Sequence, residues 1–179
     1  MGSEVIILRY GHRVVRDYRV TSHCCLVARA LGADEVIIDG DEDKSLMNSV
    51  EKIVEKFGGN FKVSFTENWL KKLKELKKSG FKIVHLTMYG LPLEKQIKGI
   101  RKPKKVVIVI GSQKVERQVY EIADYNISVT QQPHSEIAAL AVFLDWFFDG
   151  KELGNKFENA KIVIKPMKKG KCVVASCNE

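Results

Sequence analysis

The sequence predicts an α/β protein in which a mostly parallel sheet is flanked by helices. Apolar, β-branched runs of strand length recur along the chain. Stretches with helical periodicity separate these runs, and their length of roughly ten to fifteen residues suits the crossover connections of a parallel sheet. Small or polar residues follow several of the runs directly, as at the carboxyl ends of parallel strands. The length of 179 residues suits one domain.

In the first half of the chain, expected strands and helices alternate. Thr21 or Ser22 can cap a helix that runs through HCCLVARALG and ends at Gly32. Two further stretches have helical periodicity: KSLMNSVEKIVEKFGG, which stops at Gly58-Gly59, and the amphipathic ENWLKKLKELKKSG. The strands are expected at EVIILRY (4–10), EVIIDG (35–40) and FKVSFT (61–66).

The second half continues the alternation and ends in a different kind of element. Strands are expected at FKIVHLTMYG (81–90), KKVVIVIG (104–111) and YNISV (125–129). Helices are expected near LEKQIKGIR (93–101), at KVERQVYEIAD (114–124) and in the apolar segment 137–148. The tail AKIVIKPMKKGKCVVAS (160–176) is typical of two strands around a Lys-Gly turn. We therefore expect a main domain at residues 1–150 and a C-terminal extension, 151–179, that is packed on the same domain.

Composition excludes some classes of protein and leaves others open. The net charge of +8 favours polyanions as partners, although a solvated lysine-rich surface would carry the same charge. No apolar run reaches the roughly 18 residues that a membrane span needs. The first residues lack the pattern of a signal peptide. We therefore expect a cytoplasmic protein with no membrane partner.

The sequence does not favour a metal site. Without a secretory signal, the cysteines are expected to be reduced and structural; they are Cys24, Cys25, Cys172 and Cys177. The last two are spaced more loosely than a usual zinc pair, even with His23 as a further ligand. An acidic cluster follows the second expected strand: Asp39, Asp41, Glu42 and Asp43. It could hold a metal, but we interpret it as a solvated turn and the first turn of a helix, where the helix dipole favours acids.

Polar or small residues cluster after three expected strands, at His85–Pro92, Ile110–Val115 and Val129–Glu136. In open parallel sheets ligands bind beyond the carboxyl ends of the strands, where backbone groups can hydrogen-bond a purine and a ribose. Three common motifs are absent: the dinucleotide-binding G-x-G-x-x-G, the P-loop, and the G-x-S-x-G of serine hydrolases. The sequence therefore predicts a ligand site at this edge without indicating those three chemistries.

The order of these loops, followed by the apolar helix, resembles the SPOUT methyltransferases. Three segments are similar to the archaeal tRNA cytidine-56 2′-O-methyltransferases: RDYRVTSHCCLVARALGADEVII, the HLTMYG loop and IVIGSQKVERQVYEIADYNISVTQQPHSEIAALAVFLD. The likeness runs from about Val5 to Phe148. It implies a C-terminal deep trefoil knot, S-adenosylmethionine as cofactor, and transfer of a methyl group to a tRNA ribose.

In that family three loops hold the cofactor, chiefly through backbone groups. On this chain the resemblance implies the following cofactor-binding residues: Leu86, Gly111, Ser112, Gln113, Lys114, Val115, Val129, Thr130, Gln131, Gln132, Pro133, His134, Ser135 and Glu136. It also implies that the apolar helix forms the core of the knot and a subunit interface in a homodimer. A plain core helix of a monomer remains the alternative.

The likeness breaks down at the catalytic arginine. In the wider 2′-O-methyltransferase group an Asn-x-Gly-x-x-x-Arg motif carries it, and Leu26 stands at that position here. The role is therefore transferred to Arg19, with Arg16 second. A guanidinium is a poor base, so it would lower the pKa of the 2′-hydroxyl or bind the adjoining phosphate. His23 is a better base by its pKa, unless it is a structural histidine; either arginine could also be a plain surface contact.

Two other functions stay open: a SPOUT methyltransferase that acts on another RNA, such as ribosomal RNA or a tRNA base, and a catalytically silent RNA-binding protein. For tRNA binding, the excess lysines are the candidates, among them Lys71, Lys72, Lys77, Lys78, Lys168, Lys169 and Lys171. The three in the tail could instead protect an edge strand from aggregation.

Overall fold

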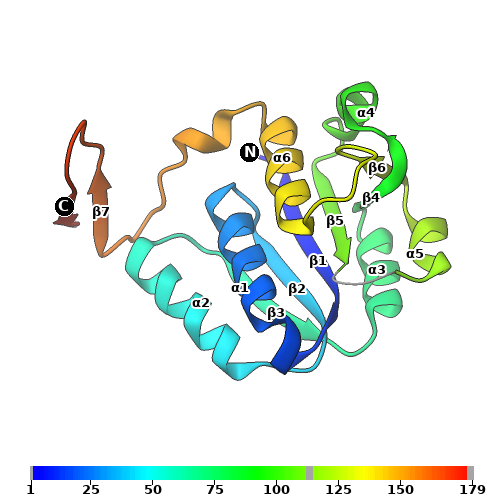
Figure 1. Ribbon diagram of the computed structural model, residues 1–179, viewed down its shortest axis with the longest axis horizontal. Coiled ribbons are helices and arrows are strands. Elements are labelled where there is room, and N and C mark those ends of the chain that lie inside the picture. Colours follow the sequence, from blue (N-terminus) through cyan, green and yellow to red (C-terminus); the bar gives the residue numbers. More distant parts are fainter. Residues whose placement is uncertain (1, 112–114, 177–179) are drawn as a thin grey trace.

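A computed structural model describes residues 2–111 and 115–176, and it contains a six-stranded sheet with the order β3-β2-β1-β5-β4-β6 (Figure 1). Every neighbouring pair of strands in this sheet is parallel. The strands are β1 (Glu4–His12), β2 (Glu35–Gly40), β3 (Lys62–Thr66), β4 (Lys82–Pro92), β5 (Lys105–Gly111) and β6 (Tyr125–Ser128). The α/β class and the positions expected for these strands are confirmed.

Helices cover both faces of the sheet, because alternate strand residues point to opposite sides. Val5 and Ile7 pack in one apolar cluster with α1, α2, α4 and α6, whereas Ile6 and Leu8 pack in the other with α3 and α5. The helices are α1 (Val14–Ala30), α2 (Lys44–Phe57), α3 (Trp69–Lys78), α4 (Leu93–Ile100), α5 (Arg117–Ile122) and α6 (Glu136–Phe148), with a short 3-10 turn, η1 (Lys151–Gly154). Within the described ranges, no helix combines the length and the apolar character that crossing a membrane would need.

Helix α1 begins at Val14, so the expected start at Thr21 or Ser22 is wrong. The carboxylate of Asp17 accepts the backbone N–H of Arg13 at 3.1 Å and so satisfies a donor at the helix start from within the first turn. The Thr21 hydroxyl is buried against His12 Nδ1 at 2.9 Å, and the Ser22 hydroxyl donates to the Arg19 carbonyl. Neither side chain is left to cap a helix.

Helix α5 is also shorter than the expected 114–124; Lys114 lies outside the described residues. It ends because the Asp124 carboxylate accepts the backbone N–H of Ile83 at 2.9 Å, which ties the chain to the start of β4. The backbone then enters β6 at Tyr125. A contact distant in sequence therefore decides where this helix stops.

The end of β4 crosses close to the backbone of β6. Both Leu86 and Leu91 pair with Ile127, so the register of the two strands shifts at the residues between them. Gly90 makes the close crossing possible, because a Cβ there would lie 2.4 Å from the backbone nitrogen of Ile127. No residue with a side chain fits at that crossing without a shift of backbone.

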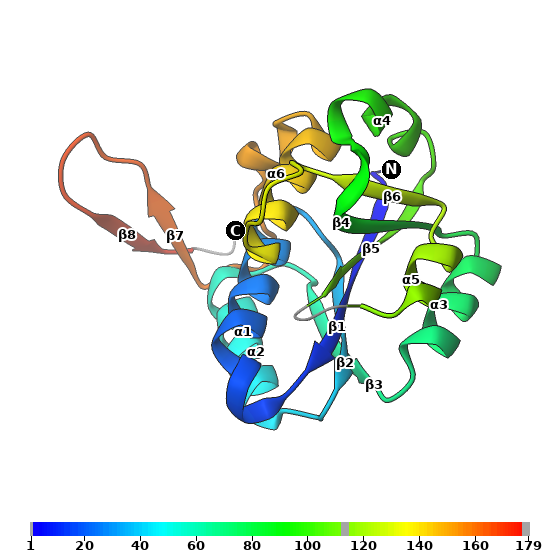
Figure 2. The same cartoon turned by 45° about the vertical axis from the view of Figure 1, so that its right-hand side comes forward.

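The C-terminal strands β7 (Ile162–Lys165) and β8 (Cys172–Ala175) form an antiparallel pair, so the expected hairpin is confirmed. It extends away from the rest of the molecule (Figures 1 and 2). The segment before it is tied down: Gly59 N–H donates to the Glu158 carbonyl at 2.8 Å, and the Arg29 guanidinium lies 4.4 Å from the centre of the Phe157 ring.

Candidate functional site

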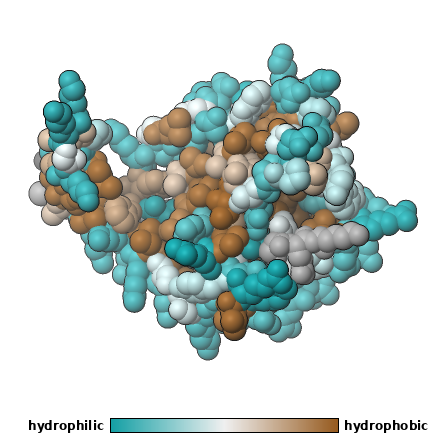
Figure 3. Space-filling view, viewed as in Figure 1, coloured by the Kyte–Doolittle hydropathy of each residue, from teal (hydrophilic) through white to brown (hydrophobic). Residues whose placement is uncertain are grey.

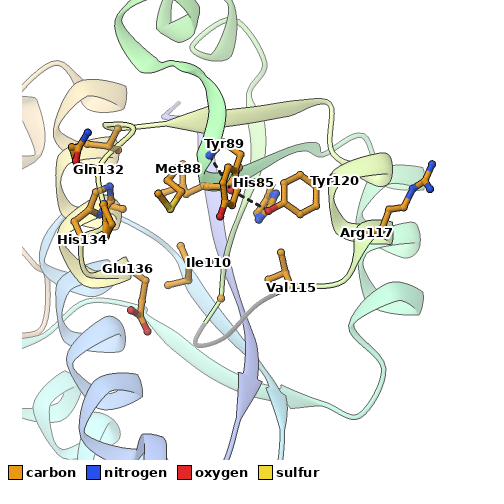
Figure 4. A pocket seen from close by; sticks show the side chains of 16 residues that line it. His85, Met88, Tyr89, Ile110, Val115, Arg117, Tyr120, Gln132, His134 and Glu136 are labelled. Atoms are coloured by element: carbon orange, nitrogen blue, oxygen red, sulfur yellow. Dashed lines mark hydrogen bonds between the residues drawn. The ribbon is translucent and has the colours of Figure 1, made fainter.

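A cavity of about 920 Å³ opens at the carboxyl ends of β4 and β5 and beside the loop after β6 (Figure 4). This edge is where an open parallel sheet binds ligands. Its lining is mostly apolar, with a few polar groups. The described lining residues are His85, Leu86, Thr87, Met88, Tyr89, Ile110, Gly111, Val115, Arg117, Tyr120, Val129, Gln132, Pro133, His134, Glu136 and Ala139.

The structure brings together most of the residues that the three loops were expected to supply. Those that line the cavity are Leu86, Gly111, Val115, Val129, Gln132, Pro133, His134 and Glu136. Three others, Ser112, Gln113 and Lys114, lie outside the described residues.

Thr130, Gln131 and Ser135 are not among the lining residues; they shape the loop instead. Gln131 Nε2 donates to Ser128 Oγ at 3.0 Å. The Thr130 and Ser135 hydroxyls accept backbone N–H groups two residues further on. The side chains of these residues hold the path of the backbone from β6 into α6.

One wall of the cavity is a polar cluster that the sequence did not indicate as a unit. Asn126 Nδ2 donates to the Tyr120 carbonyl at 2.9 Å, so Asn126 Oδ1 is the acceptor that faces His85 Nδ1, also at 2.9 Å. Burial lowers the pKa of His85, although the hydrogen bond to Asn126 opposes that shift, and the ring is therefore neutral near pH 7. The ring stands edge-on to Tyr120, whose hydroxyl bonds Thr87.

A buried arginine lies below the cavity floor. Arg9 of β1 pairs with the lining residue Ile110 of β5 and is fully buried. Its Nη2 lies 3.5 Å from Glu136 Oε1, while its Nε and Nη2 have no hydrogen-bond partner within residues 2–111 and 115–176. The expected strand EVIILRY contained this signal, since an arginine within a buried apolar run needs a partner.

Cys24 packs in the same region and is chemically inert. Burial raises the pKa of its thiol to about 12; of the charges beside it, Arg9 lowers that pKa and Glu136 raises it. The thiol is neutral at physiological pH, so it is no nucleophile.

The three candidates for catalysis, Arg16, Arg19 and His23, do not line the cavity. Their spacing places them on one stripe of α1, and all three are exposed. Leu26 continues the stripe and is also exposed. The structure thus brings these side chains together on the surface of α1, and none of them is a lining residue of the cavity.

The acidic cluster after β2 does not form a metal site. Asp43 Oδ1 caps α2 by accepting the Leu46 N–H at 2.9 Å, and Asp39 accepts the Gly11 and Trp69 N–H groups. Asp39 is buried in β2, so the interpretation as a solvated turn is wrong for it. Asp43 is also buried, but it stands at the N-cap of α2, next to the helical turn that was expected there. Across residues 2–111 and 115–176, no group of three or more metal-ligating side chains is close enough to hold an ion. Cys177, the far end of the considered pair, lies outside these ranges.

Comparison with known proteins gives consistent results. Residues 57–174 match a family described as tRNA ribose 2′-O-methyltransferase, aTrm56. A tRNA (cytidine(56)-2′-O)-methyltransferase of Methanocaldococcus jannaschii is 50% identical over 173 residues, which cover 95% of this chain and 96% of the relative. A protein of the same name from Methanopyrus kandleri is 48% identical over 168 residues, or 94% of each chain.

The fold is similar to that of solved SpoU methyltransferases at low sequence identity. The A. aeolicus TrmH/SpoU tRNA modifying enzyme has a TM-score of 0.61 at 14% identity and covers 86% of this chain and 80% of its own. AviRb of Streptomyces viridochromogenes, in complex with AdoMet, has a TM-score of 0.63 at 12% identity over 83% of this chain. The chain spans 58% of the length of AviRb.

Proposed function

The chain belongs to the tRNA ribose 2′-O-methyltransferase family of the SPOUT superfamily, and we propose that it methylates the ribose 2′-hydroxyl of cytidine 56 in tRNA. The observation that carries the proposal is the 50% identity over nearly the whole length of a relative with that name. A cavity at the expected edge of the sheet supports it.

The cavity suits S-adenosylmethionine (AdoMet), the cofactor in the AviRb complex. A volume of about 920 Å³ is near the upper end of the roughly 300–1,000 Å³ typical of ligand sites. Apolar side chains and the backbone of the strand ends can hold an adenosine, and Glu136 is the one carboxylate among the described lining residues. When bound, the cofactor supplies an electrophilic methyl group on a sulfonium.

The protein's task is then to place the ribose hydroxyl near that methyl group and to assist loss of its proton. Arg19 is the proposed residue for this, with Arg16 second, because a guanidinium can bind the adjoining phosphate and stabilise a developing oxyanion. His23, on the same exposed stripe, is the alternative as proton acceptor.

Since these residues are exposed and do not line the cavity of their own chain, they would serve the cavity of a second copy in a homodimer. Exposed apolar side chains support the dimer: Val142 and Trp146 on α6 are 40% and 42% exposed, and Leu26 on α1 is 38% exposed. Hydrophobic surface gathers in the middle of the face that carries these helices (Figure 3). Sedimentation at micromolar concentration would give a dimer, whereas a clean 20 kDa species would contradict it.

The register shift after Leu86 and the close crossing of Gly90 over the backbone of β6 support the trefoil knot that the family implies. The proposed unit is the domain 1–150 with the extension 151–179, whose segment before the hairpin packs on it, working in the cytoplasm on tRNA. The lysines of α3 and of the hairpin are the proposed phosphate contacts.

The test is methyl transfer from labelled S-adenosylmethionine to tRNA, followed by nuclease digestion and mass mapping. Label is expected in the fragment with cytidine 56, and a matched tRNA with 2′-deoxycytidine at that position is expected to accept none. Label at another nucleotide, or in ribosomal RNA alone, would point to another RNA target. Absence of cofactor binding by calorimetry would leave only an RNA-binding protein.

A further inference from the structure

Arg9 is a buried cation, and two nitrogens of its guanidinium lack hydrogen-bond acceptors in the described part of the chain. The side chain is fully buried in β1 between helices and sheet. Its Nη1 reaches the Tyr10 carbonyl at 3.5 Å, at the limit of a hydrogen bond, and among the described residues Nε and Nη2 have no hydrogen-bond partner. A buried charge without a partner is strongly disfavoured, so the position of Arg9 needs a reason.

The carboxylate of Glu136 is the counter-charge. Among the described residues it is the one carboxylate within ion-pair distance of Arg9, at 3.5 Å from Nη2. Asp17 is also near enough for Arg9 to lower its pKa, but it is bound by the N–H and the Nε of Arg13. The ion pair therefore joins the central strand to the first residue of α6.

Glu136 has one side toward Arg9 and another toward the cavity. Its side chain is 27% exposed, while that of Arg9 is 0% exposed. It lies at the end of the cavity near Ile110, the residue that pairs with Arg9 across the sheet (Figure 4). At the first position of α6 the carboxylate also benefits from the helix dipole.

We propose that Glu136 recognises a positively charged group of the bound cofactor, and that Arg9 is the positioning residue that holds the Glu136 carboxylate at the cavity floor. The inference rests on the proposed function, because S-adenosylmethionine is the ligand in question. That molecule has two cationic groups, the sulfonium and the α-ammonium. Among the described lining residues, Arg117 is a cation and repels both groups, so Glu136 is where they are favoured.

The alternative is that the ion pair only fastens α6 to the sheet. A fastening would affect stability and would weaken every ligand of the cavity alike. Recognition of a cation instead makes the loss of affinity depend on the charge of the ligand, and this difference can be measured without methyl transfer.

The experiment is calorimetry with three ligands that share the thioadenosine part: S-adenosylmethionine, S-adenosylhomocysteine and 5′-methylthioadenosine. The first has two cationic groups, the sulfonium and the ammonium, and the second has the ammonium alone as its cation. Both also carry the α-carboxylate, and the third ligand has no charged group. For Glu136→Gln we expect S-adenosylmethionine to bind about 10–100-fold more weakly, the usual effect of removing a hydrogen-bonded charge, with 5′-methylthioadenosine unchanged. S-adenosylhomocysteine distinguishes recognition of the sulfonium from recognition of the ammonium. Its affinity for Glu136→Gln falls only if Glu136 binds the ammonium.

Arg9 is tested through its effect on Glu136. Arg9→Met should reduce the same charge preference, and Arg9→Lys should restore part of it. Because Arg9→Met alone could destabilise the core, the double variant Arg9→Met/Glu136→Gln is included, which removes both charges together. The double variant should therefore have the same ratio of affinities for charged and uncharged ligands as Glu136→Gln alone.

Glu94→Gln is the matched control, since Glu94 stands in the first turn of α4, is exposed and is not a lining residue. An equal loss of affinity for all three ligands in Glu136→Gln, or no loss for any, would overturn the inference and leave the proposed function intact. Failure of the unaltered protein to bind any of the three ligands would overturn the proposed function and, with it, this inference.

Discussion

The strand-end cavity and the C-terminal hairpin both contain β-branched apolar residues, which are buried beside the cavity and exposed on the hairpin. Ile110 beside the cavity is 1% exposed, whereas Ile164 of β7 is 62% exposed. Strands β4 and β5 are covered by helices on both faces, but β7 and β8 pair only with each other. A two-stranded hairpin has little independent stability, so its apolar residues do not make a core.

The difference indicates how the two regions would contribute to function. A buried site strengthens electrostatic interactions and excludes water, as methyl transfer requires, but each of its residues also supports the fold. Exposed lysines on a hairpin can meet an RNA backbone without disturbing the core. Substitutions near the cavity should therefore have large effects, and substitutions in the hairpin should have small effects that are confined to RNA affinity.

The largest effect is expected from Gly90→Ala, at the point where the end of β4 crosses close to the backbone of β6. The added Cβ would lie 2.4 Å from the Ile127 nitrogen and 2.5 Å from the Asn126 carbonyl carbon and oxygen. Forcing that backbone apart should lower the free energy of unfolding by about 1–3 kcal/mol and remove cofactor binding. Urea unfolding and calorimetry measure both. Gly154→Ala is the control, since its Cβ would meet nothing within 4 Å; equal behaviour of the two variants would refute the tight crossing.

Gly111→Val should remove cofactor binding while the protein stays folded. Gly111 ends β5 and lines the cavity, so a branched side chain there enters the space proposed for the adenosine. Gly154→Val, in the exposed turn η1, gives the same chemical change outside the cavity. An unchanged dissociation constant for S-adenosylmethionine in Gly111→Val would show that the loop was assigned wrongly.

Arg19→Ala should reduce methyl transfer by about 10²–10³-fold and leave cofactor affinity nearly unchanged, because the side chain is exposed on α1 and outside the cavity. Arg16→Ala, on the same stripe, should have the smaller effect. Single-turnover rates and calorimetry separate the two quantities. Full activity of Arg19→Lys would mean that charge alone suffices and would rule out a bidentate contact with phosphate.

The smallest effect is expected from replacing Lys168, Lys169 and Lys171 with Gln. The logarithm of tRNA affinity should depend less steeply on the logarithm of salt, by about 0.7–0.9 for each phosphate that the variant no longer neutralises. Cofactor binding should not change. The control is the same replacement at three exposed lysines near α4: Lys95, Lys98 and Lys102. An equal change in slope for both sets would assign the effect to net charge, and no change in the hairpin variant would assign its lysines to solubility.

Much of the fold could be predicted because its signals are local. The β-branched run KKVVIVIG is of strand length and forms β5, and the Lys-Gly turn of the tail lies between the two strands of the hairpin, as expected. The start of α1 could not be predicted in this way. The hydroxyl of Thr21 suited a cap, but the fold places it against His12, and Asp17 serves the helix start instead.

The candidate site divides along the same line. The loops after β4, β5 and β6 could be located, because each follows a buried strand directly. His85 and Tyr120 could not be paired from the sequence, since they belong to a strand and a helix whose contact forms only in the fold, where Asn126 of β6 hydrogen-bonds both residues. The catalytic candidates on α1 had the right residue types, but their exposure depends on which face the helix buries.

The sequence by itself determined the fold class, the order of elements and the family, because periodicity and local motifs act between near neighbours along the chain. Only the tertiary structure decided that Arg9 forms an ion pair with Glu136 and that Gly90 lies against the backbone of β6. It also decided that Arg19 faces solvent. The physical reason is that burial, ion pairing and close backbone contact depend on distances between segments far apart in sequence, and packing alone sets those distances.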